Sequence, residues 1–265
     1  MTRYRNRLLA ALPSSELDRL SPLLEPIRLE RRMVAYDPGR PISHVYFVET
    51  GVISIVSLMT DGSAIETATI GDEGMIGLPV FQGVDVVAEQ AFVQVPGDGH
   101  RMTAESFRRV VASCPVLQRQ LNRFAVALFT LAAQHSGCNR MHAIEQRCAR
   151  WLLTVHDRVG RDEFELTQDF LSQMLGVRRA TVSEVASEFQ KAGYITYTRG
   201  RLTILDRAGL ERTACACYEV VRSTFARLLD SRDVHSPLDT LEISEDGKSL
   251  AGDGAPSEPS RIGES

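Results

Sequence analysis

The feature that most restricts the fold of this chain is a compact unit between residues 166 and 206. A helix is expected to start near Thr167, whose hydroxyl can cap it, and to end at Gly176, which can adopt the left-handed turn of a helix-to-helix corner. A second helix is expected over residues 178–192, and two alternating segments then flank Arg199-Gly200 as a β-hairpin. Two helices, a tight turn and a hairpin in this order predict a winged helix-turn-helix.

The second helix of this unit presents polar and basic side chains from its first turns. A recognition helix buries one face against its partner helix and offers the other to base edges in the major groove. The arginine fork matches the acceptors of guanine, while threonine, serine and glutamate can contact phosphates or bases. Arginines at the hairpin tip lie where a wing can meet the DNA backbone. The candidate DNA-binding residues are Arg178, Arg179, Ala180, Thr181, Ser183, Glu184, Lys191, Arg199 and Arg201.

The net charge of −4 does not argue against a nucleic-acid partner, because the acidic side chains are concentrated at the C-terminus. Residues 231–265 carry eight acidic and three basic side chains, a net charge of −5, which leaves +1 for residues 1–230. This acidic segment is rich in Gly, Pro and Ser and has no aromatic residue, so it is predicted to be disordered.

Residues 30–98 have a different pattern, with short β-rich runs separated by turns such as Pro38-Gly39 and Asp61-Gly62. Turn signals roughly every ten to twelve residues are typical of a sandwich or barrel rather than of βαβ units. The expected fold class is therefore α+β. It combines an N-terminal antiparallel β-roll of the jelly-roll, cupin-like kind with a long helix and the C-terminal winged helix-turn-helix.

A long helix is expected over residues 113–138, ending near Gly137. On it, mainly apolar side chains recur at spacings of 4, 3, 4, 3 and 4, which is the a/d seam of a coiled coil. A helix packed on its own domain would also show an apolar stripe, but usually a wider one. The seam predicts a homodimer interface, where titration of its histidine near neutrality would make pH a modulator. Its residues are Leu117, Leu121, Phe124, Leu128, Leu131 and His135.

The segments LTQDFLSQMLGVRRATVSEV and QKAGYITYTRGRLTI resemble the C-terminal domain of the Crp–Fnr family of bacterial transcription regulators. Upstream, YDPGRPISHVYFVETGVISIVSLMTDGSAIETATIGDEGMIG resembles the β-roll of that family, so that the resemblance covers roughly residues 14–207. It implies a homodimer that places two recognition helices in successive major grooves of double-stranded DNA, at a near-palindromic site. RNA polymerase is a further partner that the resemblance suggests.

The expected organisation of the chain has five parts. They are a β-roll sensor-like domain with N-terminal helices (1–112), the dimerisation helix (113–138), the winged helix-turn-helix domain (139–207), a C-terminal helix (208–230) and the acidic tail (231–265). No apolar stretch is long enough to span a bilayer, and the N-terminus has no signal-peptide core. A cytoplasmic protein without a membrane partner is therefore expected.

The recognition helix departs from the family pattern at three positions. The resemblance places Arg179 on the arginine that commonly reads a guanine. Ala180, which could touch a thymine methyl, stands where the family has a glutamate, and Glu184 stands where it has a later arginine, so a different target sequence is expected. Arg178 stands where a capping Ser or Cys is frequent. Losing a cap costs about 1 kcal/mol, which a phosphate contact by Arg178 would offset.

Control by a cyclic nucleotide in the usual mode is not expected. Family members that bind these ligands use a Gly-Glu-Leu turn for the ribose and an Arg-Ser/Thr-Ala segment for the phosphate. This chain has Gly77 and Leu78 at the first place, and Glu89 and Gln90 at the second. Leucine cannot accept a ribose hydrogen bond, and Glu89 replaces the required cation with an anion. Residues 41–100 contain no Arg or Lys that could take its place.

Metal, cofactor and catalytic chemistry are not expected either. The five cysteines are scattered without a CxxC pair, and Cys215 and Cys217 would lie about 200° apart on a helix, which favours inert thiols. The first cysteine, Cys114, comes too late for the N-terminal cluster of the family's iron–sulfur members. A cupin metal site needs about three histidines and a carboxylate, and the roll offers only His44 and His100.

One alternative from a different functional class remains open at this point. A β-roll interaction module whose helix-turn-helix no longer reads DNA would have the same fold and would act through a protein contact. A gel shift with genomic fragments separates the two functions.

Overall fold

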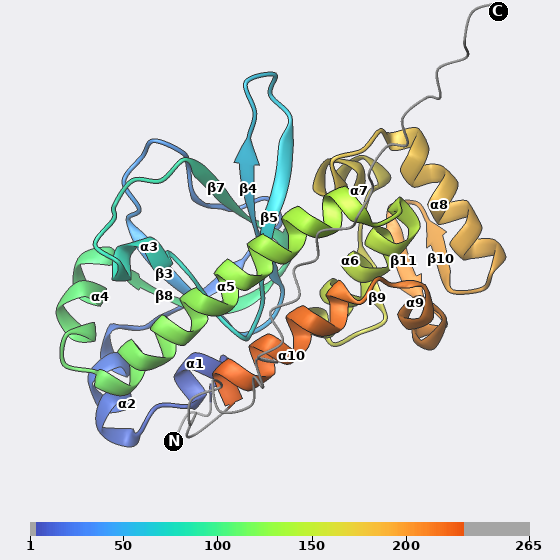
Figure 1. Ribbon diagram of the computed structural model, residues 1–265. Coiled ribbons are helices and arrows are strands. Elements are labelled where there is room, and N and C mark those ends of the chain that lie inside the picture. The colour runs from blue at the N-terminus through green and yellow to red at the C-terminus, as the bar shows by residue number, and fades with distance from the viewer. Residues whose placement is uncertain (1–3, 231–265) are drawn as a thin grey trace, which may run out of the picture. The chain divides into compact units, whose positions relative to one another are not determined.

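The computed structural model describes residues 4–230 of the chain (Figure 1). The acidic tail expected over residues 231–265 lies outside the described residues. Within the described part, no helix is both long and apolar enough to cross a membrane.

The N-terminal half is a β-roll made of two antiparallel four-stranded sheets, which confirms the expected fold class. One sheet has the order β1-β8-β3-β6 (Glu25–Leu29, Gly97–Thr103, His44–Val48, Met75–Ile76). The other has the order β2-β7-β4-β5 (Val34–Tyr36, Glu89–Val95, Val52–Leu58, Ala64–Ile70). The short helices of this half are α1 (Arg7–Ala10), α2 (Ser14–Leu20), the 3-10 turn Ser21–Leu23, α3 (Leu78–Phe81) and α4 (Ala104–Val111).

The long helix α5 extends over Pro115–Met141, so the expectation that it ends near Gly137 is wrong. A glycine inside a helix costs about 1 kcal/mol relative to alanine. The next residue, Cys138, is completely buried, and its packing holds the last turn in place. The helix ends at His142, whose backbone N–H donates to the carbonyl of Cys138.

The C-terminal half begins with α6 (Ile144–Val159) and contains the expected helix-turn-helix and hairpin. Its elements are β9 (Glu163–Glu165), α7 (Gln168–Leu175), α8 (Arg179–Lys191), β10 (Ile195–Thr198), β11 (Arg201–Ile204), α9 (Arg207–Thr213) and α10 (Cys217–Asp230). The single helix expected over residues 208–230 is therefore two helices. The chain becomes extended at Ala214, and the intervening Cys215 is not helical.

The seam side chains of α5 face the chain's own core rather than the solvent. Leu117, Leu121 and Phe124 are fully buried, and Leu131 and His135 are nearly so. Part of this cover is α10, which lies along α5 (Figure 1), with the rings of Phe225 and Phe124 6.3 Å apart in an edge-to-face contact. These side chains are not available to a partner subunit, except Leu128, which is only partly buried.

His135 does not provide the pH response that its place on the seam suggests. Burial, together with the nearby guanidinium of Arg150, lowers the pKa of His135 to about 3. Its Nε2 lies 2.6 Å from Nη1 of Arg150, which is always a donor, so this nitrogen accepts. The imidazole is therefore neutral throughout the physiological pH range.

The first helix of the C-terminal half, α6, packs on the β-roll through a buried polar cluster. Trp151 Nε1 donates to Glu66 Oε1 at 2.8 Å, and burial raises the pKa of Glu66 to about 7. Ser54 Oγ lies 2.9 Å from Glu66 Oε2 and 2.6 Å from Gln94 Oε1. Because a hydroxyl has one proton to donate, both contacts are hydrogen bonds only when Glu66 carries a proton.

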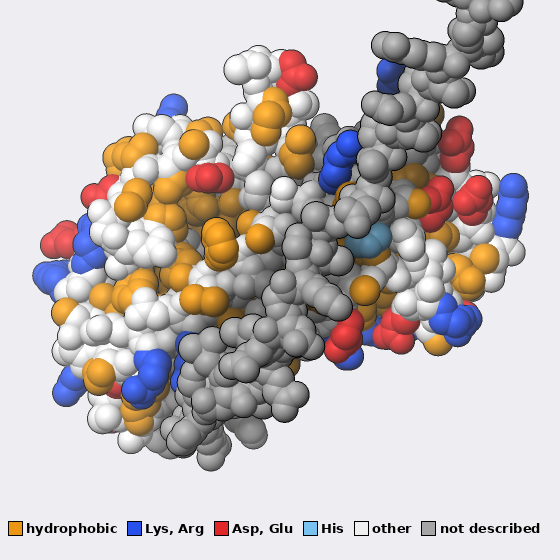
Figure 2. All heavy atoms as spheres, in the orientation of Figure 1, with side chains coloured by type: hydrophobic (Ala, Val, Ile, Leu, Met, Phe, Trp, Pro, Cys, Tyr) orange, Lys and Arg blue, Asp and Glu red, His pale blue; other side chains and the backbone are white. Residues whose placement is uncertain are grey.

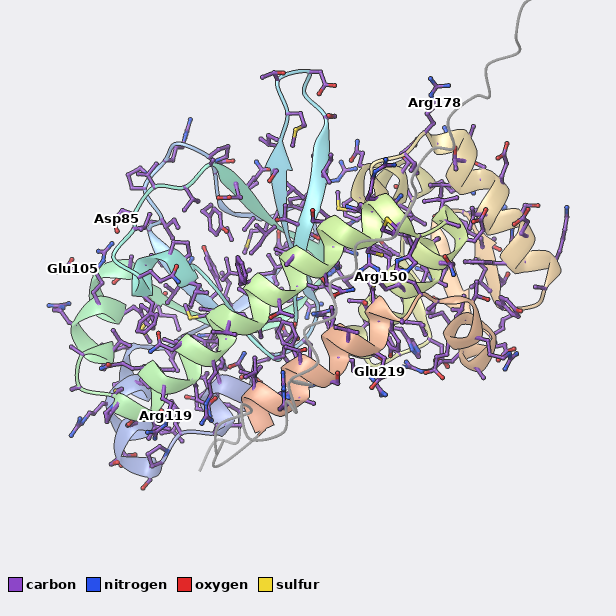
Figure 3. The ribbon with its side chains drawn as sticks, in the orientation of Figure 1. Asp85, Glu105, Arg119, Arg150, Arg178 and Glu219 are labelled. Atoms are coloured by element: carbon purple, nitrogen blue, oxygen red, sulfur yellow. The ribbon has the colours of Figure 1, made fainter. Side chains whose placement is uncertain are left out.

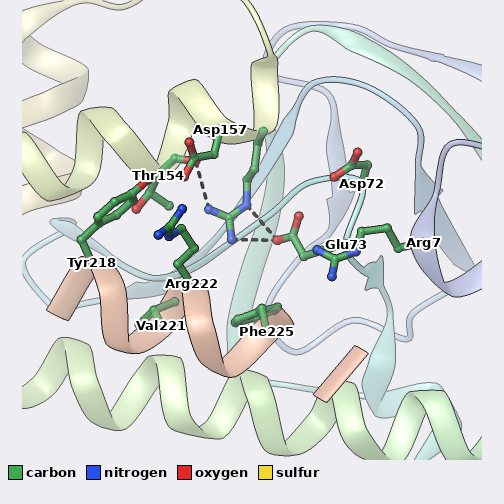
Figure 4. Close-up of a pocket in the computed structure, with 10 residues that line it drawn as sticks. Arg7, Asp72, Glu73, Thr154, Asp157, Tyr218, Val221, Arg222 and Phe225 are labelled. Carbon is green, nitrogen blue, oxygen red and sulfur yellow. Dashed lines mark hydrogen bonds and ion pairs between the residues drawn. The ribbon is translucent and has the colours of Figure 1, made fainter. Parts of the chain in front are cut away.

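A buried ion pair makes the second link between α6 and the β-roll. Arg158 Nη2 lies 2.7 Å from Glu73 Oε1, and both side chains are about nine-tenths buried. Glu73 lines a pocket together with Tyr218 and Arg222 of α10 (Figure 4). Substitution of one partner of such a pair leaves the other charge buried and unpaired. This lowers the free energy of unfolding by roughly 3–5 kcal/mol. The orientation of α6 on the roll thus depends on Glu66 and Glu73.

Substitution of Glu66 by Gln tests the protonation of this interface. A carboxyl whose pKa is raised by folding stabilises the fold below its ordinary pKa, and that stability is lost as the pH rises through the folded value. We expect Glu66→Gln to be about 1–3 kcal/mol more stable than the unsubstituted chain at about pH 8, with the difference shrinking towards about pH 5. Urea unfolding across this pH range measures it.

The exposed carboxylate Glu30 provides the control. Glu30→Gln is expected to leave the free energy of unfolding and its pH dependence unchanged. A Glu66→Gln difference that stays constant with pH would contradict a buried, neutral Glu66.

Candidate nucleic-acid interface

The corner between α7 and α8 is built by local hydrogen bonds. Thr167 caps α7 by accepting from the backbone N–H of Phe170, as expected from the sequence. Gly176 ends the helix with φ of 64°, a left-handed conformation that favours glycine. Ser183 of α8 then donates to Gln168 Oε1 at 2.6 Å, which ties the two helices together.

Helix α8 has one apolar face and one exposed face. Val182, Val185, Ala186 and Phe189 are buried against the rest of the C-terminal half. Arg178, Arg179, Ala180 and Glu184 are exposed, while Thr181 is partly covered. In Figure 3 the Arg178 side chain points outwards at the start of α8. The first turns of α8 therefore offer a cation pair, a methyl and a carboxylate to a partner.

Arg179 is held in a weak ion pair in the free protein. Its Nε lies 3.3 Å from Asp169 Oδ1, in the first turn of α7, and both side chains are 66% exposed. An exposed pair of this kind contributes at most about 1 kcal/mol. It positions the guanidinium beside the corner and can be exchanged for a stronger bidentate contact with a guanine.

Two residues expected to touch DNA are less suited to it in the structure. The Ser183 hydroxyl is used inside the protein, where it contacts Gln168 and the carbonyl of Arg179. Lys191 is exposed but ends α8, about 18 Å along the helix from Arg179 at 1.5 Å per residue. Lys191 lies at the helix end where a cation is favoured by the helix dipole.

The hairpin that follows α8 forms the wing. Arg199 and Gly200 both have positive φ, 50° and 79°, as a two-residue turn of the primed type requires. Both Arg199 and Arg201 are exposed, and Arg201 Nη1 lies 3.2 Å from Glu163 Oε1 on the neighbouring strand β9. Figure 2 shows both basic and acidic side chains on the outer end of this half of the molecule.

The hairpin between β4 and β5 reaches the helix-turn-helix corner. Ile65 lies 3.9 Å from the position of a side chain at Gly176, and a shallow pocket between them is lined by Ser63, Ala64 and Arg178. The start of α8 is thus adjacent to the sensor-like half as well as open to solvent.

The residues expected to form a degenerate nucleotide pocket lie in or beside the core of the β-roll. Gly77 has φ of 91° and starts α3, and Leu78 is buried among the core side chains. Gln90 Nε2 donates to Asp37 Oδ1 at 2.7 Å. Burial raises the pKa of Tyr36, and the nearby Glu89 carboxylate adds to the rise. The charge contributed here by Glu89 is negative, which disfavours a phosphate.

Four side chains of types that bind metals, which the sequence analysis did not group, lie close together in the structure. The ligand atoms of Cys138, His142, Cys215 and Cys217 all lie within 4.8 Å of one another. The expectation that Cys215 and Cys217 lie on opposite sides of one helix does not apply, because Cys215 precedes α10. The spacing of Cys138 and His142 by four residues at a helix end was the available signal.

The chain is similar to known proteins in both sequence and fold. A family model described as the Crp-like helix-turn-helix domain matches residues 146–213. The Transcriptional regulatory protein btr of Bordetella pertussis is 25% identical over 217 residues, which cover 76% of this chain and 86% of that protein. These matches confirm the sequence resemblance to the Crp–Fnr family of transcription regulators.

Further relatives show the same similarity. A Mycobacterium tuberculosis protein named as a CRP-like cAMP-activated global transcriptional regulator is 23% identical over 76% of this chain and 92% of its own length. The solved structure of FixK2 from Bradyrhizobium japonicum has the same fold, with a TM-score of 0.62 at 18% identity over 73% of this chain and 98% of that chain. The two relatives found by sequence are both named as transcriptional regulators.

Substitution of Arg178 by Ser separates the two roles of the residue that precedes α8. Arg178 has the extended conformation of an N-cap but makes no side-chain cap hydrogen bond. Arg178→Ser is expected to raise the free energy of unfolding by about 1 kcal/mol, because serine can cap the helix. It should also weaken DNA binding. The dependence of the logarithm of the binding constant on the logarithm of the salt concentration should become shallower by about one unit, which corresponds to the loss of one phosphate contact. An unchanged affinity with an unchanged salt slope would exclude the phosphate contact.

Proposed function

We propose that this Crp–Fnr protein is a sequence-specific DNA-binding regulator that acts as a homodimer in the cytoplasm and has no enzymatic activity. The observation that carries the proposal is the exposed first turn of α8, with Arg178, Arg179 and Ala180 beside a basic wing. Arg179 is the proposed base reader, with Thr181 and Glu184 as secondary contacts. Arg178, Arg199 and Arg201 supply phosphate contacts.

The proposed dimer interface lies on a different stripe of α5 from the one that the seam indicated. Asn122, Val126, Phe129, Ala133 and Ser136 are all exposed, and their spacing of 4, 3, 4 and 3 is again that of a coiled-coil seam. Phe129 is 76% exposed and Val126 is 55% exposed. Apolar side chains this exposed on a long helix are typical of an interface, and a two-fold axis would pair the stripe with its copy.

Control by cyclic AMP in the usual mode is not part of the proposal. The Mycobacterium tuberculosis relative is named as cAMP-activated. In this chain, Leu78 and Ala91 are part of the apolar core of the roll, and the acidic Glu89 is beside Tyr36. A buried phosphodiester requires a cation, and residues 41–100 contain no Arg or Lys.

Substitution of Arg179 by Ala tests the base reader, with Arg199→Ala as the matched control. A bidentate contact with guanine contributes about 1–3 kcal/mol, so Arg179→Ala should lose that affinity for the specific site and relax one base position. Arg199→Ala should weaken specific and nonspecific DNA alike and reduce the salt slope by about one. Footprinting on genomic fragments, followed by titration at several salt concentrations, measures both.

If the unsubstituted protein binds no genomic fragment at low salt, the proposal of a DNA-binding regulator fails. The alternative is then a β-roll module that acts through a protein contact. Equal effects of the two substitutions on specific and nonspecific DNA would remove Arg179 from the base-reading role.

A charge placed in the exposed α5 stripe tests the dimer. Phe129→Asp is expected to convert a dimer to a monomer in sedimentation at micromolar concentration, because burying an unpaired carboxylate is strongly unfavourable. Val86→Asp places the same charge on an exposed apolar site of the β-roll and should leave the assembly unchanged. A dimer that survives Phe129→Asp would place the interface elsewhere.

A further inference from the structure

The junction between α5, α6 and α10 contains a buried group of soft ligands. Cys138 ends the buried face of α5, and His142 follows that helix. Cys215 precedes α10, and Cys217 is its first residue. The three cysteines are between 0% and 4% exposed and form a small cluster apart from the two apolar cores. This cluster links two segments that lie 77 residues apart in the chain.

The distances within the cluster fit a single tetrahedral ion. Cys138 Sγ and Cys215 Sγ are 3.5 Å apart, and Cys217 Sγ is 3.5 Å from His142 Nδ1. Metal–sulfur bonds of about 2.3 Å at tetrahedral angles place ligand atoms about 3.8 Å apart. The limit of 4.8 Å for all pairs matches one ion, while a cluster of two irons would need a wider cage.

The surroundings of the cluster favour negative charge on sulfur. Arg150, which Figure 3 shows beside the end of α5, is 4% exposed, and its Nε has no hydrogen-bond partner. Arg147 Nε is likewise buried without a partner. Gln134 Nε2 donates to Cys217 Sγ at 3.0 Å, an outer hydrogen bond of the kind that orients a thiolate ligand.

We propose that Cys138, His142, Cys215 and Cys217 bind one Zn²⁺ ion, which fastens the start of α10 to the end of α5. Three thiolates and a neutral imidazole around a divalent ion leave a net charge of −1, opposite in sign to the nearby guanidinium groups of Arg150, which is buried, and Arg147, which is partly buried. All four positions are filled by protein, so the site is structural rather than catalytic. The zinc holds α10 over the buried seam of α5, next to the turn that leads into α6.

Metal content and X-ray absorption of the full-length protein test the zinc site. Protein produced with added zinc and dialysed is expected to hold about one zinc per chain, with three sulfur ligands at about 2.3 Å and one nitrogen at about 2.0–2.1 Å. Cys138→Ser and Cys215→Ser should lose most of the bound zinc. Cys114→Ser is the matched control, a buried cysteine on the same α5 region about 36 Å away, and should keep it.

Hydrogen exchange gives a second readout that needs no substitution. Removal of zinc by a chelator is expected to speed exchange of the α10 amides at least tenfold, roughly, while strands of the β-roll stay protected. Each of four results would overturn the proposal: thiols without metal, a Cys138–Cys215 disulfide in the purified protein, an iron–sulfur chromophore, or zinc content that survives both cysteine substitutions.

Discussion

The docking of α6 on the β-roll is the interaction on which the rest of the molecule depends. Two carboxyl groups of the roll, Glu66 and Glu73, meet Trp151 and Arg158 of α6 in a buried interface. A buried ionisable group is stable only with its partners in place, so these contacts allow few orientations of the helix. The core of the helix-turn-helix packs on α6 in a cluster that also contains Trp151 and valines of the roll, so its orientation depends on the same helix.

The long helix α5 has two faces with different roles. Its buried face is covered by the β-roll and by α10, through contacts such as Phe124 with Phe225. Its exposed stripe carries Val126 and Phe129, which a second copy would cover. The roll contacts the C-terminal half through α6, through the β4–β5 hairpin beside Gly176, and near the end of α5, where the proposed zinc ligands lie.

Local sequence patterns predicted the elements of the DNA-binding half well. The cap at Thr167, the corner at Gly176 and the positive φ of Gly200 each follow from a residue type that favours one backbone conformation. The turn spacing also predicted the β-roll. Predictions that depended on tertiary packing were less successful. The a/d spacing on α5 was correct, but the seam packs against the chain's own core. The single C-terminal helix that was expected is interrupted at Ala214 and Cys215.

The sequence by itself determined which residues share a helix face, where helices start and stop around caps and glycines, and which helix can read DNA. Only the tertiary structure decided what covers each face. A heptad pattern is the same whether the helix packs on its own domain or on a copy, because the period fixes direction but not partner. Likewise, Cys138 and Cys215 are far apart in the chain, and only the path of α10 back along α5 brings their sulfur atoms to 3.5 Å.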